Sequence, residues 1–166
     1  MSAALDGLAL VLLPTNLLAL AALGLLAGRP GRRIVSGILF AIGLVTGALA
    51  IATALRDPPA ATALLGIAAL AGIVVAAAWR PAPPVTGALA FAGGAALALN
   101  TPPQAVTLAG AVLSQLGSGL GAIAAFAVIA TMASAARQPW HHVALRVVAS
   151  WVAASAILVL ALRLAR

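Results

Sequence analysis

Apolar residues form six long runs along this chain, separated by short stretches rich in proline, glycine and arginine. The runs cover roughly residues 5–27, 34–55, 60–79, 85–115, 119–136 and 143–164. About 20 residues of α-helix cross the hydrocarbon core of a bilayer, and five of the runs have about that length. The fourth is longer, and a polar break divides it. The pattern predicts an all-α bundle of six transmembrane helices, with the first and fourth helices broken.

The two breaks are the most informative polar positions in the chain. The first is Pro14-Thr15-Asn16, and the second is Asn100-Thr101-Pro102, with a further proline after it. An unpaired backbone or amide group is costly inside a bilayer, because no water is there to bond with it. Breaks at matching places in two halves of a chain are the best sequence indication of a transport site.

The halves of the chain, about 5–79 and 85–164, align as a repeat. Thr101 follows Thr15 by 86 positions, and Phe126 follows Phe40 by the same interval. Three crossings in each half would insert the halves in opposite orientations, as in many secondary transporters. The sequence therefore predicts a 3+3 inverted repeat within one integral membrane domain that covers residues 1–166.

Composition supports the membrane assignment. The 166 residues are 64% hydrophobic and only 7% charged, whereas a soluble domain carries roughly 25% charged residues. No cysteine is present, so disulfides and thiolate metal sites are excluded. We expect the N-terminal segment to be retained, because it lacks the basic region of a cleavable signal. The net charge of +7 could suggest nucleic-acid binding, but no soluble face remains to hold it.

Nine arginines and two aspartates carry all the formal charge. The first, third and fifth connections contain most of the arginines, and the second contains only Arg56, offset by Asp57. A fourth connection is expected at residues 117–119, which contain two glycines. The positive-inside rule places the odd connections in the cytoplasm of a bacterial cell, with both termini outside the inner membrane.

Glycines recur at four-residue spacing, as in Gly24 and Gly28, and in Gly43 and Gly47. Such spacing places small residues on one helix face, so that two backbones can approach closely. We interpret it as packing inside the bundle rather than as a dimer interface.

A known family shares these features. The first half resembles the start of the LysE/RhtB exporter superfamily, through residues 14–16, Gly24, Gly28, the arginines at 29, 32 and 33, and the glycines at 37, 43 and 47. The second half adds residues 87–91, residues 99–102 and Gln115. The resemblance covers roughly residues 8–137 and implies an inverted-repeat exporter. Its branches include lipid-addressing proteins of actinobacteria and metal-ion exporters.

The chain departs from the family pattern, with Thr15 in place of a glycine and Thr101 before the proline, so no substrate is carried over. The HupE/UreJ proteins have a similar size but carry membrane histidines and acids.

A broken helix exposes carbonyl groups at one end and N–H groups at the next, which attract cations and anions respectively. Amides and hydroxyls would add neutral partners, which suits a zwitterion or a polar headgroup better than a bare metal ion. The expected substrate-binding residues are Pro14, Thr15, Asn16, Asn100, Thr101, Pro102 and Gln104. We expect no metal or cofactor, and no enzymatic activity, because no nucleophile–base pair or paired carboxylates are present.

Two functions remain open. The first is a small secondary exporter of an amino-acid-like solute or a lipid headgroup. The second is a non-transporting accessory subunit that packs against a larger membrane complex. The matched breaks favour the first, and the absence of charge within the membrane favours the second. The expected partners are the lipid bilayer, a small-molecule substrate, and a homodimer or larger complex.

Overall fold

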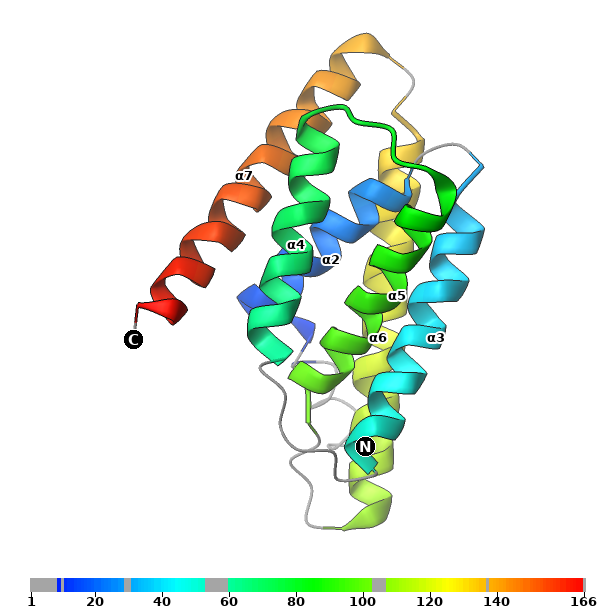
Figure 1. Cartoon of the computed structure of the whole chain (residues 1–166). Coiled ribbons are helices and arrows are strands. Elements are labelled where there is room, and N and C mark those ends of the chain that lie inside the picture. The colour runs from blue at the N-terminus through cyan, green and yellow to red at the C-terminus, as the bar shows by residue number, and fades with distance from the viewer. Residues whose placement is uncertain are drawn as a thin grey trace.

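The computed structural model is a bundle of helices (Figure 1) and describes residues 9, 11–28, 31–52, 60–102, 107–136 and 138–165. The described part of the chain contains α2 (Pro14–Ala27), α3 (Arg33–Ala52), α4 (Ala60–Ala76), α5 (Pro83–Asn100), α6 (Leu108–Ser134) and α7 (Pro139–Leu164). The prediction of an all-helical fold with six main helices is confirmed for these residues.

Three helices in the described part of the chain are long and apolar enough to cross a membrane. They are α3, α6 and α7, with candidate spans of 19, 26 and 25 residues. Two more helices, α2 and α4, are apolar but shorter. These helices indicate a membrane protein.

The predicted boundary between the fourth and fifth segments is wrong. The expected break of the fourth run at Asn100 is confirmed, because α5 ends there. The expected link at 117–119 is wrong, because α6 continues unbroken from Leu108 to Ser134. Glycine is tolerated within helices in lipid, and the Ser118 hydroxyl donates to the Gln115 carbonyl at 3.0 Å. The second break, with no charged residue in it, is therefore the connection between these helices.

The helices alternate in direction along the chain (Figure 1). The shortest of them, α2, lies at the centre and packs against α4, α5, α6 and α7. Leu20, Leu23 and Leu26 on α2 are at most 2% exposed. The 14 residues of α2 span about 21 Å, less than the roughly 30 Å of a hydrocarbon core. The surrounding helices therefore bury a helix that is too short to cross alone.

Glycines set the closest helix contacts. Gly43 and Gly47 face α5, and Gly94 on α5 faces the backbone of α3. Gly24 faces Ile129 on α6, and Gly28 faces Ala133 there. Both glycine pairs singled out in the sequence thus pack within the bundle, as interpreted above.

Arginines connect the helix ends at one end of the bundle. Arg32 Nη1 donates to the Pro81 carbonyl at 2.6 Å, and Arg146 Nε donates to the Ala76 carbonyl at the end of α4 at 3.0 Å. The first, third and fifth connections therefore meet at this end, which we call the arginine end.

The end of α4 is a tight turn with alanine in an unusual conformation. Ala78 has φ 54°, while Trp79 N–H donates to the Val74 carbonyl at 3.1 Å and Ala78 N–H to the Val75 carbonyl at 3.0 Å. This is a Schellman motif, in which glycine is usual at the left-handed position.

We expect Ala78→Gly to stabilise the protein by up to about 1 kcal/mol, because the left-handed conformation is strained for a residue with a Cβ. The free energy of unfolding in mixed micelles measures this. Ala77→Gly is the control and should not stabilise, because Ala77 has no positive φ. Equal effects of the two substitutions would contradict the assignment of strain to Ala78.

Candidate functional site

The first break is the start of α2. Leu13 is extended, with φ −58° and ψ 137°, and Pro14 occupies the first turn. Proline disfavours a helical conformation in the residue before it, and its missing N–H is harmless at a helix start. Asn16 N–H donates to the Leu13 carbonyl at 2.9 Å. Asn16 therefore lies in the first turn of the central helix, α2.

The second break is the end of α5. Thr101 leaves the helical conformation, with φ −121° and ψ 60°, because Pro102 follows it. Its hydroxyl is oriented back toward its own helix, where the Leu97 and Ala98 carbonyls lie 3.1 Å and 3.3 Å away. Asn100 is therefore the last residue of a helix whose end is capped locally.

The two breaks meet in space. Asn100 Nδ2 donates a hydrogen bond of 2.8 Å to Asn16 Oδ1. Asn16 is fully buried, at 0% exposed, and Asn100 is half-buried. The start of α2 and the end of α5 thus face each other through an amide pair, which we call the Asn16–Asn100 pair.

The other predicted site residues divide into three groups. Thr101 is buried and Thr15 half-buried beside the pair. Pro14 and Pro102 are exposed, so they shape the backbone rather than line an interior site. Gln104 lies outside the described residues.

A largely apolar cavity of about 490 Å³ lies next to the second break. Thr101, Gln115 and Ser118 are its polar lining residues, among apolar side chains of α3, α5 and α6. The Gln115 Oε1 atom is buried and accepts no hydrogen bond from any described residue. In the sequence, Gln115 contributed only to the family resemblance and was not predicted as a site residue. Gln115 is an isolated amide in an otherwise apolar segment, and this feature of the sequence could have identified it as a candidate site residue.

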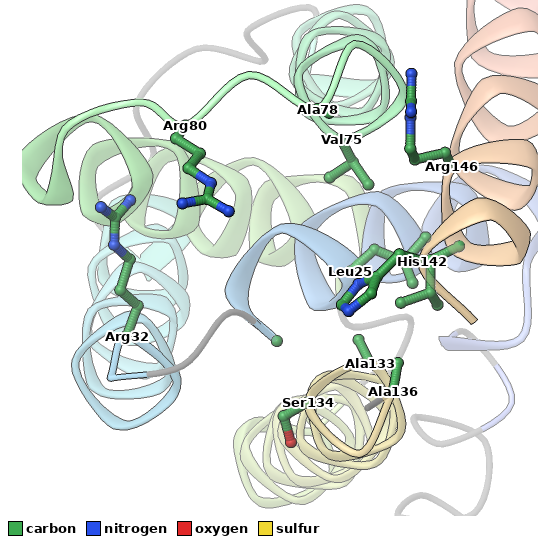
Figure 2. Close-up of a pocket in the computed structure, with 12 residues that line it drawn as sticks. Leu25, Arg32, Val75, Ala78, Arg80, Ala133, Ser134, Ala136, His142 and Arg146 are labelled. Carbon is green, nitrogen blue, oxygen red and sulfur yellow. The ribbon is translucent and has the colours of Figure 1, made fainter. Parts of the chain in front are cut away.

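A second cavity, of about 600 Å³, lies at the arginine end (Figure 2). Its polar lining residues are Arg32, Arg80, Ser134, His142 and Arg146. From the sequence, these arginines were expected to fix the topology, and Arg32 also contributed to the family resemblance, but their grouping around one cavity was not predicted. They come from distant connections, so no spacing along the chain could have revealed it.

The polar groups that line the two cavities are hydroxyls, one amide, one imidazole and guanidinium groups. Among the described residues, no three His, Asp or Glu side chains lie together as a metal site would require. The cavity-lining hydroxyls of Thr101, Ser118 and Ser134 donate to carbonyls of their own helices. What remains are the Gln115 amide, the His142 imidazole and the guanidinium groups, which recognise ligands by hydrogen bonds and charge.

The fold and the site together define an all-helical protein with membrane-length apolar helices and an amide pair where α2 starts and α5 ends. No known protein family, curated protein or solved structure matches this chain.

Proposed function

We propose that this protein crosses the bacterial inner membrane six times, with the arginine end in the cytoplasm and both termini outside. The positive-inside rule supports this orientation. Arg32, Arg33, Arg80 and Arg146 belong to the arginine end, and among the described residues only Arg163 lies near the other end of a helix. The shorter helices would cross with the help of their neighbours and flanking residues.

The proposed architecture is a 3+3 inverted repeat, with α2, α3 and α4 equivalent to α5, α6 and α7. Each helix runs opposite to its counterpart (Figure 1). Phe40 and Phe126 are equivalent in the alignment of the halves, and their rings stack at 4.6 Å between centroids with an angle of 9° between planes. Equivalent residues contact each other where they lie near a pseudo-twofold axis, so this pair supports the repeat.

The proposed activity is export of a small polar or zwitterionic solute, amino-acid-like or a lipid headgroup. The hydrogen bond between Asn16 and Asn100, across 84 positions of sequence, carries this proposal. It joins the two breaks that a transporter of this architecture would use as its binding site. The resemblance to the LysE/RhtB superfamily points the same way.

The helix ends at the pair suit a zwitterion. The N-terminus of α2 bears a partial positive charge and the C-terminus of α5 a partial negative charge. A carboxylate or phosphate would lie at the start of α2, and an ammonium group at the end of α5. In this arrangement the substrate would replace the hydrogen bond that the two amides make with each other.

The two cavities suit alternating access. Along α6, the apolar cavity ends at Ile123 and the arginine-end cavity begins at Ala133, a separation of about 15 Å. Phe126 and its stacked partner lie within this interval. The layer packed around Phe40 and Phe126 would separate the cytoplasmic cavity from the cavity near the opposite end. Rocking of the two halves would move this barrier from one side of the Asn16–Asn100 pair to the other.

Counterflow in proteoliposomes tests the carrier. Vesicles containing the purified protein are loaded with one unlabelled solute at a time, and uptake of its radiolabelled form is followed. The panel is L-lysine, L-threonine, L-leucine, choline and phosphoethanolamine. We expect one class to exchange, and Asn16→Ala and Asn100→Ala each to slow it about tenfold, the effect of one hydrogen bond.

Thr131→Ala is the matched control, because the exposed Thr131 hydroxyl bonds only its own helix at Ala127. All variants are compared at equal folded fraction by gel filtration. The carrier proposal fails if either asparagine variant, correctly folded, exchanges every panel solute at the wild-type rate.

The accessory-subunit function has one observation in its favour. In α7, only 17% of the most apolar stretch is buried in the bundle, and Trp151 on it is 75% exposed. Such a helix could pack against another membrane protein. Co-purification of a stoichiometric partner, lost on Trp151→Ala while the panel shows no exchange, would support this function instead.

A further inference from the structure

The cavity at the arginine end carries positive charge that no described carboxylate neutralises. Arg32, Arg80 and Arg146 line it together with His142. The only two acidic side chains of the chain, Asp6 and Asp57, lie outside the described residues. Three guanidinium groups around one cavity repel each other unless an anion lies between them.

Two of the arginines are held in place by neutral groups. Arg32 Nη1 donates to the Pro81 carbonyl and to the Thr86 hydroxyl at 3.3 Å. Arg146 uses its Nε for the Ala76 carbonyl. Each guanidinium has five N–H donors, so these bonds fix the side chains and leave further donors for a ligand.

Arg80 has no hydrogen bond within the described part of the chain, and it is exposed. Figure 2 shows its side chain extending from the α4–α5 connection toward the middle of the cavity, with Arg32 on one side and His142 and Arg146 on the other. It is therefore the arginine best placed to reach a ligand.

The inner wall of the cavity is apolar. Leu25 on α2, Val75 on α4 and Ala133 on α6 line it and are each at most 9% exposed. A cationic rim over an apolar wall suits a ligand that joins an anionic group to an apolar or neutral part. The volume of about 600 Å³ lies within the range of small-molecule sites and exceeds what a bare anion needs.

We propose that this cavity binds a phosphate-bearing anion, either the headgroup of an anionic phospholipid or a soluble phosphate compound. Guanidinium groups match phosphate oxygens through paired hydrogen bonds. Arginines from three different elements line this cavity, and their N–H donors exceed what one carboxylate can accept. Basic pockets between helices on the cytoplasmic side are known positions for anionic headgroups. This inference concerns a site apart from the Asn16–Asn100 pair and does not depend on transport.

Native mass spectrometry of the whole chain in dodecyl maltoside tests the site. The lipid probes are phosphatidylglycerol, which is anionic, and phosphatidylcholine, which is zwitterionic. We expect tighter binding of phosphatidylglycerol. Arg80→Gln should weaken it roughly fivefold, the contribution of one arginine near an anionic headgroup. Arg80→Lys should lie between, because it keeps the charge without the planar fork.

Arg163→Gln is the matched control, because it removes the same charge near the far end of α7, and we expect it to leave the lipid preference intact. Competition with inorganic phosphate and glycerol 3-phosphate distinguishes the sources. Displacement of the lipid assigns the site to soluble phosphates, and no displacement assigns it to the lipid headgroup. The proposal is overturned if the two lipids bind equally and neither inorganic phosphate nor glycerol 3-phosphate binds. Equal loss of binding in the Arg80 and Arg163 variants would also overturn it.

Discussion

Gly43→Ala is expected to cost at least about 1–3 kcal/mol of unfolding free energy, the usual cost of overfilling a packed core. An added Cβ would overlap the Phe91 carbonyl oxygen and lie 2.9 Å from its carbon and 3.1 Å from Ala95 N. All three are backbone atoms of α5, so no side chain can rotate away. The reciprocal position behaves alike, because a Cβ on Gly94 would overlap the Phe40 carbonyl oxygen.

Unfolding by sodium dodecyl sulphate in mixed micelles, followed by tryptophan fluorescence, measures the effect. Gly66→Ala is the control, since a Cβ there meets nothing within 4 Å. It should be neutral or stabilise by up to about 1 kcal/mol, because alanine favours the helix more than glycine does. If the two variants have the same stability, α3 and α5 do not lie in backbone contact.

Phe40→Ala is expected to cost about 3–5 kcal/mol, the range for removing a buried aromatic ring. Phe40 is 1% exposed and Phe126 3% exposed, and their stacked rings fill the junction of α3 and α6. Deleting one ring leaves a void between the two cavities. On the carrier proposal, the variant should also let solutes pass without exchange, because the layer that separates the cavities is opened.

The third phenylalanine of the chain provides the control. Phe91 is 37% exposed, so Phe91→Ala should cost less than Phe40→Ala and leave the vesicles sealed. Unfolding titrations and passive efflux of a preloaded solute measure the two effects. A Phe40 variant as stable as the Phe91 variant would show that the stacked pair is not a core element.

The Asn16–Asn100 pair and the arginine-end cavity place two kinds of recognition in one small bundle. The amides lie where α2 starts and α5 ends, and the guanidinium groups lie where α2 ends and α3 and α5 start. Loss of counterflow in asparagine variants and loss of lipid preference in Arg80 variants are separate measurements. Either site can therefore fail without the other.

Some boundaries were predictable because a local chemical rule decides them. Pro14 marks a helix start and Pro102 follows a helix end, since proline limits the conformation of the residue before it. The expected link at residues 117–119 was wrong. Its glycines favour a turn only where water can bond the backbone groups that a turn leaves unpaired. In apolar surroundings the helix keeps its own hydrogen bonds, so α6 runs through.

The sequence by itself determined the class of this protein and the positions of its polar breaks. A chain with 64% hydrophobic and 7% charged residues has too few polar side chains to cover a surface in water, whatever its fold. Only the tertiary structure decided that Asn16 bonds Asn100, that Phe40 stacks on Phe126, and that three arginines share one cavity. Each of these groupings joins parts of the chain that are far apart in sequence, and it depends on how the helices pack rather than on any local spacing.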